Sequence, residues 1–272
     1  MRKIVILSFY LVFSLYNSQI SAQEITNIAI EEDRTEMKIT ILYDNYVFKE
    51  GTKADWGFAC LIENSDHTIL FDTGAKEDIL MHNIKSLNVN IFEIDAIVIS
   101  HNHWDHTGGL NAILKLNSDL NLYMPCSTDP REIDRMSRTG ANVIMVKEPK
   151  EIIEGIYLTG EMGDDIREQS LIIDSPQGII VITGCSHPGI INILKKAKQI
   201  MDKNIYLVTG GFHLHRKTEE EIDDIINYFK SMGVKRCGCS HCSGEKTIGK
   251  FNETYADNFI KIGTGKVISL DY

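Results

Sequence analysis

Short apolar runs rich in strand-forming residues recur along most of the chain and predict β-strands. Turn residues separate two neighbouring pairs of these runs, at Asn64-Ser65-Asp66 and at Pro176-Gln177-Gly178, so at least two hairpins are expected. The predicted strands are Met37–Leu42, Gly57–Glu63, His67–Phe71, Ala96–Ser100, Leu120–Met124, Val143–Val146, Gln169–Asp174, Gly178–Thr183, Ile205–Thr209 and Lys266–Leu270.

Helical periodicity lies between the predicted strands. The clearest helix begins at Thr218, whose side chain can cap it while Glu221 returns the capping-box contact, and it ends before Gly233. A second helix follows Pro188-Gly189, and a third is expected at Ile79–Leu87. The apolar faces carry Ile222, Ile225, Ile226 and Phe229 in the first helix, and Ile190, Ile193, Leu194, Ala197 and Met201 in the second.

Hairpins with interspersed helices, each apolar on one side, predict an α/β fold with helices packed on the outside of a sheet core. Periodicity alone does not tell how many sheets there are. With 272 residues, 43% of them hydrophobic, and only 5 prolines, the chain is expected to form one globular domain.

Residues 1–22 have the pattern of a secretory signal peptide. Arg2 and Lys3 form a basic start, an apolar run follows from Ile4 to Tyr16, and the segment ends in the small residues Ser21-Ala22. This run is shorter than the ~20 apolar residues that a membrane-spanning helix needs, which argues against a membrane anchor. We expect cleavage after Ala22. We therefore predict a mature domain of residues 23–272 that is periplasmic or secreted.

The net charge of −10 argues against a nucleic-acid partner, which normally requires a basic face. A local basic pocket for an anionic small-molecule substrate remains compatible with this charge. The oligomeric state cannot be predicted from these features.

A cluster of metal-binding residue types follows the predicted strand Ala96–Ser100. His101 and His103 point to the same side of an extended chain, because side-chain direction repeats every two residues, so they can share one metal ion. Asp105 and His106 lie further round the turn and can face a second ion. Imidazole and carboxylate suit zinc above all, and also iron(II) or manganese. Two divalent transition-metal ions are therefore expected, with a metal-bound hydroxide as the nucleophile.

The stretch Ser100-His-Asn-His-Trp-Asp-His-Thr-Gly-Gly-Leu110 resembles the His-x-His-x-Asp-His signature of the metallo-β-lactamase superfamily. Leu70-Phe-Asp-Thr-Gly74 is similar to the superfamily's first motif, which implies that Asp72 supports the metal-binding loops. The resemblance also implies a four-layer αββα sandwich with the metals at one edge, between the sheets.

The second half of the chain departs from the superfamily pattern. Val181–Gly189 occupies the place of a metal-bridging Asp but contains none, so Cys185 or His187 is the candidate ligand, and we favour His187. The loop before Gln169 lacks the usual His, which makes His187 or His213 its candidate replacement.

The remaining histidines include two further candidates for the site, His241 and His213, and three residues without a comparable context. His241 resembles the superfamily's final ligand, at the end of a late strand. His213 follows the strand Ile205–Thr209, and three roles stay open for it: metal ligand, proton shuttle to the leaving group, or packed loop residue. His67, His82 and His215 are expected to be ordinary surface residues.

Three of the 6 cysteines crowd around His241 in Cys237-Gly-Cys239-Ser-His-Cys242, and no second Cys pair lies at structural-zinc spacing. A zinc knuckle or a disulfide among Cys237, Cys239 and Cys242 is an open alternative in an oxidising compartment. Cys60 and Cys126 are expected to be small buried hydrophobic residues.

Three motifs, Thr183-Gly-Cys-Ser-His-Pro-Gly-Ile190, Gly210-Gly-Phe-His-Leu214 and His241-Cys-Ser-Gly244, narrow the resemblance to the subfamily of 7,8-dihydropterin-6-methyl-4-(β-D-ribofuranosyl)-aminobenzene-5'-phosphate synthase. An exported protein would be poorly placed to meet the intracellular substrates of that reaction. We therefore expect an exported hydrolase acting on an ester, phosphoester or related bond. A pterin-synthase-like transferase and a non-catalytic metal-binding protein are the alternatives.

Overall fold

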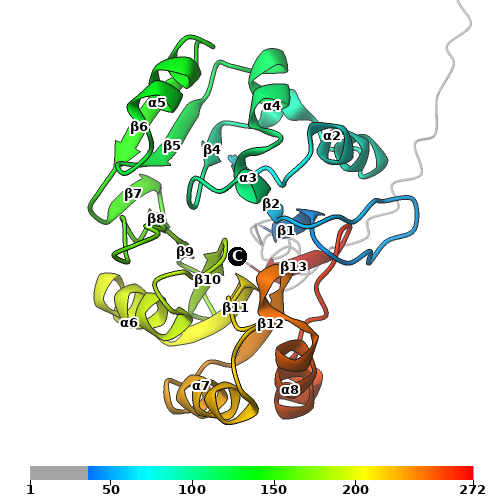
Figure 1. Ribbon diagram of the computed structural model, residues 1–272, viewed down its shortest axis with the longest axis vertical. Coiled ribbons are helices and arrows are strands. Elements are labelled where there is room, and N and C mark those ends of the chain that lie inside the picture. The colour runs from blue at the N-terminus through cyan, green and yellow to red at the C-terminus, as the bar shows by residue number, and fades with distance from the viewer. Residues whose placement is uncertain (1–35, 272) are drawn as a thin grey trace, which may run out of the picture. The chain divides into compact units, whose positions relative to one another are not determined.

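The computed structural model describes residues 36–271, which contain two β-sheets (Figure 1). The first sheet has the strand order β13-β1-β2-β3-β4-β5-β6, and the second has the order β12-β11-β10-β9-β8-β7. The strands of the first sheet are β1 (Glu36–Tyr43), β2 (Ala59–Glu63), β3 (Thr68–Phe71), β4 (Ala96–Val98), β5 (Asn121–Pro125), β6 (Asn142–Val146) and β13 (Val267–Asp271). Those of the second are β7 (Lys150–Ile153), β8 (Ile156–Leu158), β9 (Leu171–Ile173), β10 (Ile179–Thr183), β11 (Ile205–Gly211) and β12 (Arg236–Ser240).

The two sheets share one apolar core. Fully buried side chains of the first sheet, such as Ile39 and Val98, belong to the same cluster as Ile180 and Leu207 of the second. Burying one face of each sheet against the other removes both faces from water, which is the main driving force for this packing.

Helices cover the outer faces of both sheets (Figure 1). Leu80 and Ile113 cluster with sheet residues such as Ile97, and Phe229 clusters with Val208 of the second sheet. The four layers are therefore helix, sheet, sheet and helix, which confirms the αββα sandwich. The helices are α2 (Glu77–Ser86), α3 (Trp104–Thr107), α4 (Leu110–Leu116), α5 (Pro130–Ser137), α6 (Ile190–Ile200), α7 (Glu219–Ser231) and α8 (Glu245–Tyr255).

The expected helices at α2, α6 and α7 are confirmed. In α7 the Oγ1 atom of Thr218 accepts the N–H of Glu221 at 3.2 Å, and the Glu221 carboxylate accepts the N–H of Thr218 at 2.8 Å. This reciprocal capping satisfies two N–H groups at the start of the helix.

Both expected hairpins are also confirmed. β2 pairs antiparallel with β3, and the side chain of Asn64 accepts the N–H of His67 in the turn between them. β9 pairs antiparallel with β10 across the turn at Pro176-Gln177-Gly178.

Other elements were not expected from the sequence. β7 and β12 lie at the two edges of the second sheet, and the β12 sequence Arg-Cys-Gly-Cys-Ser has no apolar alternation. The expected strand Gln169–Asp174 shortens to β9, because Gln169 instead connects the sheets: its backbone N–H donates to Ser100 O at 2.9 Å and its side chain donates to Ile99 O at 2.8 Å.

The predicted signal peptide and its cleavage site lie outside the described residues. Within residues 36–271, no helix has the length and apolar character needed to cross a membrane.

Candidate metal centre

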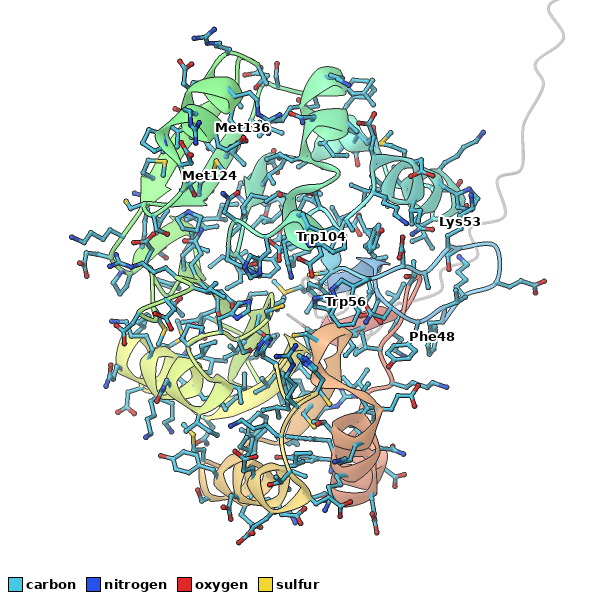
Figure 2. All side chains as sticks on the ribbon, viewed as in Figure 1. Phe48, Lys53, Trp56, Trp104, Met124 and Met136 are labelled. Atoms are coloured by element: carbon cyan, nitrogen blue, oxygen red, sulfur yellow. The ribbon has the colours of Figure 1, made fainter. Side chains whose placement is uncertain are left out.

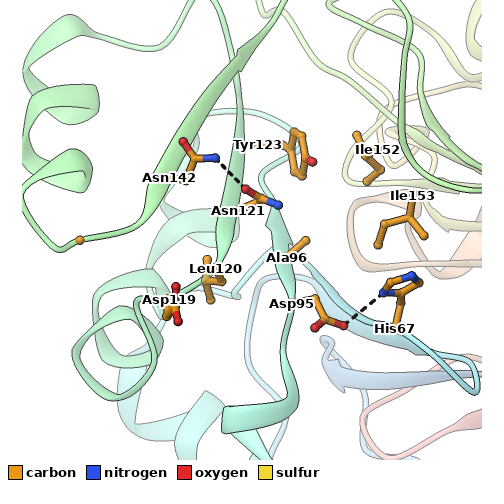
Figure 3. A pocket seen from close by; sticks show the side chains of 11 residues that line it. His67, Asp95, Ala96, Asp119, Leu120, Asn121, Tyr123, Asn142, Ile152 and Ile153 are labelled. Atoms are coloured by element: carbon orange, nitrogen blue, oxygen red, sulfur yellow. Dashed lines mark hydrogen bonds and ion pairs between the residues drawn. The ribbon is translucent and has the colours of Figure 1, made fainter.

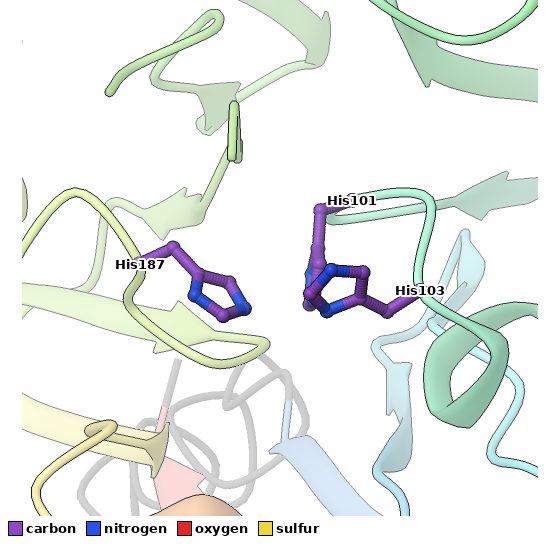
Figure 4. Close-up of side chains that lie close together, drawn as sticks. All are labelled: His101, His103 and His187. Carbon is purple, nitrogen blue, oxygen red and sulfur yellow. The ribbon is translucent and has the colours of Figure 1, made fainter. Parts of the chain in front are cut away.

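Three imidazoles converge where β4 and β10 end. The Nε2 atom of His101 lies 3.0 Å from Nδ1 of His103, and the ring of His187 lies 4.8 Å from the first ring and 4.9 Å from the second. Figure 4 shows His187 reaching this pair from the opposite loop. Their candidate ligand atoms all lie within 4.8 Å of one another. We call these three residues the first ligand group.

A second ligand group lies beside it and consists of Asp105, His106 and His241. Oδ2 of Asp105 is 3.4 Å from Nε2 of His241 and 3.9 Å from Nε2 of His106. All three residues are buried. These two sets keep His101 and His103 apart from Asp105 and His106, as the sequence predicted, but His101 also forms a set with His106 and Cys185.

Cys185 lies between the two ligand groups. Its Sγ atom is 3.3 Å from Nε2 of His106, and it forms sets of candidate ligands with His101 and His106 and, separately, with His187 and His213. The sequence left open whether Cys185 or His187 serves the site. The structure brings both to it: they share one set with His213, and each also belongs to a set without the other.

Asp72 fixes the orientation of two histidines. One carboxylate oxygen accepts the N–H of Ser100 at 2.7 Å, and the other accepts both the Ser100 hydroxyl and Nδ1 of His106, each at 2.7 Å. Since the Ser100 proton is directed at Asp72, its oxygen is free to accept from Nδ1 of His101 at 2.9 Å. His101 thereby carries its proton on Nδ1 and leaves Nε2 unprotonated on the side of the cluster, and Asp72 holds the ring of His106 through the proton on its Nδ1.

Two residues that the sequence did not single out, Asn45 and Trp56, orient side chains of the second ligand group through hydrogen bonds. Oδ1 of Asn45 lies 3.0 Å from Nδ1 of His241, and Nε1 of Trp56 donates to Oδ2 of Asp105 at 2.8 Å. Neither Asn45 nor Trp56 belongs to a motif, so only the fold reveals them. Trp56 and Trp104, which Figure 2 labels, are 43% and 63% exposed.

Burial sets the charge of several members of the cluster. It lowers the pKa of His101 well below its ordinary value and that of His187 to about 3, with the neighbouring imidazoles acting in the same direction. Burial also acts on His106, but Asp72 outweighs it and raises the pKa of His106 to about 9. His101 and His187 are thus neutral near pH 7, which is the form that binds a metal ion.

The residues fit a metal ion by a further criterion. Nε2 of His187 and Nε2 of His241 are buried and have no hydrogen-bond partner among the described residues. A buried polar atom without a partner costs about 1–3 kcal/mol, so such atoms are rare unless another group satisfies them. A metal ion bound by each ligand group would satisfy both nitrogens.

Backbone strain concentrates at this centre. Asp72, Ser186, His213 and His241 have φ values of 56°, 67°, 53° and 48°, in the left-handed region that non-glycine residues seldom adopt. Such conformations cost of order 1–3 kcal/mol each and persist only where the surroundings impose them.

Glu168 is a fully buried carboxylate behind the loop that carries Cys185 and His187. Oε1 accepts the N–H groups of Gly184, Cys185 and Ser186 at 3.1, 2.9 and 2.9 Å, and Oε2 accepts that of His187 at 2.8 Å. Burial raises the pKa of Glu168, whereas these hydrogen bonds lower it. No sequence motif marks this residue.

His213 lies at the outer side of the cluster. Its ring is exposed and lies 4.4 Å from the ring of His187, and the contact with Cys242 raises the pKa of His213 above its ordinary value. Burial opposes ionisation of Cys242, but Cys185 and His213 hold the pKa of the Cys242 thiol well below its usual range.

His215 is also at this edge: its ring is 5.4 Å from that of His213 and its Nδ1 is 3.1 Å from Cys242 O. It is exposed, as expected, but lies beside the centre. His67 is remote, since it lines a cavity of about 590 Å³ with Asp95 at the opposite ends of the strands (Figure 3). His82 is half-buried on α2, where its Nε2 contacts Gly51 O at 2.9 Å.

The cysteines correct one expectation. Cys237, Cys239 and Cys242 are free and buried, so the structure holds no disulfide among them. Cys60 is buried as expected. The expectation for Cys126 is wrong: it is exposed, because it lies in the turn just after β5 ends at Pro125.

Comparison with known proteins agrees with this architecture. The family model of the metallo-beta-lactamase superfamily matches residues 57–125, which include Asp72 and the His101–His106 motif. The chain is 29% identical to 7,8-dihydropterin-6-methyl-4-(beta-D-ribofuranosyl)-aminobenzene-5'-phosphate synthase of Methanocaldococcus jannaschii, over 85% of this chain and 96% of the synthase. It is 30% identical to an uncharacterized protein of the same organism, over 85% of this chain and 100% of that protein.

Solved structures give the same result for the fold. A metal-dependent hydrolase of the beta-lactamase superfamily superimposes with a TM-score of 0.73 at 25% identity, covering 87% of this chain and 100% of its own. The metallo-beta-lactamase fold protein YhfI from Bacillus subtilis gives a TM-score of 0.63 at 14% identity, with the same coverage of both chains.

Proposed function

Because the chain belongs to the metallo-β-lactamase superfamily, we propose that it is a metal-dependent hydrolase of an ester, phosphoester or related bond in a small molecule. The observation that carries this proposal is the pair of adjacent ligand groups, in which the buried Nε2 atoms of His187 and His241 lack a hydrogen-bond partner among residues 36–271. If the histidine cluster were only structural, both nitrogens would stay buried and unsatisfied, which native proteins rarely tolerate.

The first ligand group would hold one divalent ion, and the second would hold another, with Cys185 placed to contact both. Imidazole, carboxylate and thiol donors together suit zinc best, with iron and manganese as alternatives. When bound, such ions lower the pKa of a coordinated water towards ~7 and polarise the bond to be cleaved.

The protein's own residues supply orientation and proton transfer. Asp72 and Asn45 hold the histidines with Nε2 facing the cluster. His213 is exposed beside His187, so its imidazole is accessible to a bound substrate. Because its pKa is raised, we assign it the role of donating a proton to the leaving group.

Export is part of the proposal and rests on residues 1–22 alone, with their basic start and short apolar run. N-terminal sequencing of protein from fractionated cells should find a chain that begins near Gln23 outside the cytoplasm. An intact Met1 on cytoplasmic protein would remove this part.

A pterin-synthase-like transferase is the second candidate function. The identity of 29% to the M. jannaschii synthase over 85% of this chain favours it. A cytoplasmic location would strengthen this alternative, because the pterin substrates are intracellular.

One panel of assays separates these candidates. The mature protein, loaded with zinc, manganese or iron, is tested against phosphodiester, phosphomonoester, lactone, thioester and sulfate-ester substrates, and against the two pterin-synthase substrates. We expect turnover in the hydrolytic part of the panel and its loss in a His101→Ala/His103→Ala control. Condensation of the pterin substrates without any hydrolysis would establish the transferase, and metal binding without turnover throughout would indicate a non-catalytic metal protein.

A further inference from the structure

Cys242 brings a second buried thiol to the centre. It follows His241 in the short 3₁₀ turn His241–Ser243, and it is only 2% exposed. Its Sγ atom lies 3.5 Å from the carbonyl oxygen of Cys185. The candidate ligand atoms of Cys185, His241 and Cys242 all lie within 4.8 Å of one another. The sequence placed this thiol in the motif His241-Cys-Ser-Gly244 but did not name it as a ligand of the metal centre.

The fold makes room for this approach at one glycine. Gly211 ends β11, and a Cβ atom there would lie 2.7 Å from Sγ of Cys242 and 3.2 Å from Cα of Cys185. The same Cβ would lie 2.4 Å from the carbonyl oxygen of Gly184, and this distance and that to Cys242 are both shorter than real Cβ contacts allow, so a side chain here would displace the Cys185 loop or Cys242. The glycine therefore permits the two cysteine-bearing loops to meet.

Hydrogen bonds fix the backbone that carries Cys242. The Ser243 hydroxyl donates to Ser240 O at 2.7 Å and accepts the N–H of Phe212 at 3.0 Å. The left-handed φ of 48° at His241 turns the chain immediately before Cys242. With its backbone held on both sides, the thiol is preorganised towards Cys185.

An independent observation points to a ligand among these three residues. Nε2 of His241 is buried, lacks a hydrogen-bond partner among the described residues, and belongs to the same set as the two thiols. Two thiols beside an unsatisfied imidazole nitrogen form the donor set that soft or borderline metal ions prefer.

We propose that Cys242 supplies a second thiolate, beside that of Cys185, to the ion that His241 binds. This inference rests on the metal centre of the proposed function and specifies the ligand class of its second ion. A site with two thiolates selects zinc or another thiophilic ion over manganese and magnesium, which prefer oxygen ligands. Cys242 thus also accounts for metal preference at this centre.

Cobalt(II) reports the number of bound thiolates directly, through a near-ultraviolet thiolate-to-cobalt absorption. The mature protein is loaded with cobalt under reducing, oxygen-free conditions. Relative to wild type, Cys242→Ser and Cys185→Ser should each reduce the absorption per bound cobalt to about half, because each removes one of two thiolates. Cys239→Ser is the matched control: Cys239 is equally buried nearby but belongs to none of the ligand sets, so the absorption should not change.

X-ray absorption of the zinc-loaded wild type makes the test independent of any variant's folding. The proposal requires about two sulfur neighbours at about 2.3 Å from one of the zinc ions. A single sulfur neighbour, or a Cys242→Ser variant with undiminished cobalt absorption, would overturn it while leaving the hydrolase proposal intact. Two thiolates in a protein that turns over no substrate would support the role of Cys242 and overturn the hydrolase proposal. A wild type that binds no metal would overturn both proposals.

Discussion

The carboxylate of Glu168 accepts the backbone N–H of His187 at 2.8 Å, and its other oxygen accepts three consecutive N–H groups just before it. One buried side chain thus holds the whole loop that carries Cys185 and His187. The loop needs this support because Ser186 has a left-handed φ of 67°. We regard Glu168 as a positioning residue, since it reaches the cluster only through the backbone.

Glu168→Gln should therefore release this loop. A glutamine keeps one acceptor oxygen but turns an NH₂ group towards backbone N–H donors, so at least one buried donor loses its partner at a cost of about 1–3 kcal/mol. We expect a lower melting temperature and reduced zinc content, measured by elemental analysis. Glu151→Gln is the matched control, because Glu151 also accepts a backbone N–H, at 3.0 Å from Gly155, but lies exposed on β7. Equal effects of the two substitutions would refute the positioning role.

Asp72→Asn tests the support of the first motif. The three hydrogen bonds from Ser100 and His106 use both carboxylate oxygens, and an amide cannot accept all of them. Loss of such a partner of a ligating histidine typically costs 10–100-fold in metal affinity or activity, and we expect a loss of about that size. Zinc competition with a chromophoric chelator measures the affinity. Asp66→Asn, in the exposed turn after β2, serves as control, and unchanged affinity in Asp72→Asn would contradict the assignment.

The first half of the centre was predictable because its residues are close in sequence. His101 to His106 lie in one turn after a buried strand, so the side-chain period of an extended chain already indicated which pairs face the same way. The helix cap at Thr218 was predictable for the same local reason.

The second half depends on contacts between distant segments. Glu168, Asn45 and Trp56 act through buried hydrogen bonds across the fold, and nothing in their neighbouring residues signals this. The preference for His187 over Cys185 rested on residue type and on Pro188-Gly189, whereas the position of both side chains depends on how the loop after β10 turns at Ser186. Strands β7, β8 and β12 were missed because β7 and β8 span only four and three residues and β12 has no apolar alternation.

Asp44 should make the stability of the metal-free protein depend on pH. This carboxyl group is fully buried, and burial raises its pKa to about 6, although the Ser240 hydroxyl donates to it at 2.6 Å. A carboxyl group whose pKa is higher in the folded than in the unfolded chain binds its proton more tightly when folded. Its contribution to stability is therefore full below about pH 4 and is lost as the pH rises to about 6.

Asp44→Asn removes this titration. The free energy of unfolding of the variant, relative to wild type, should increase by up to about 3 kcal/mol between pH 4 and pH 7. Urea unfolding of chelator-treated protein at both pH values measures the difference. A difference that stays constant across this range, or that shrinks with rising pH, would show that Asp44 does not titrate in this way.

The histidines His187 and His213 lie ring to ring at 4.4 Å but differ in burial, and this difference separates a ligand from a proton donor. His187→Ala should lower metal content and activity together, because it removes one of the three imidazoles of the first ligand group. His213→Ala should retain its metal and lose roughly 10²- to 10⁴-fold in kcat, the usual contribution of a positioned acid. Elemental analysis and kcat measured on the same preparations distinguish these effects, with His67→Ala as a remote control.

Loss of a metal ion from His213→Ala would make His213 a ligand, since it also forms a set with Cys185 and His187. Full metal content with full activity would leave it as a packed loop residue, and the proton for the leaving group would then have to come from elsewhere.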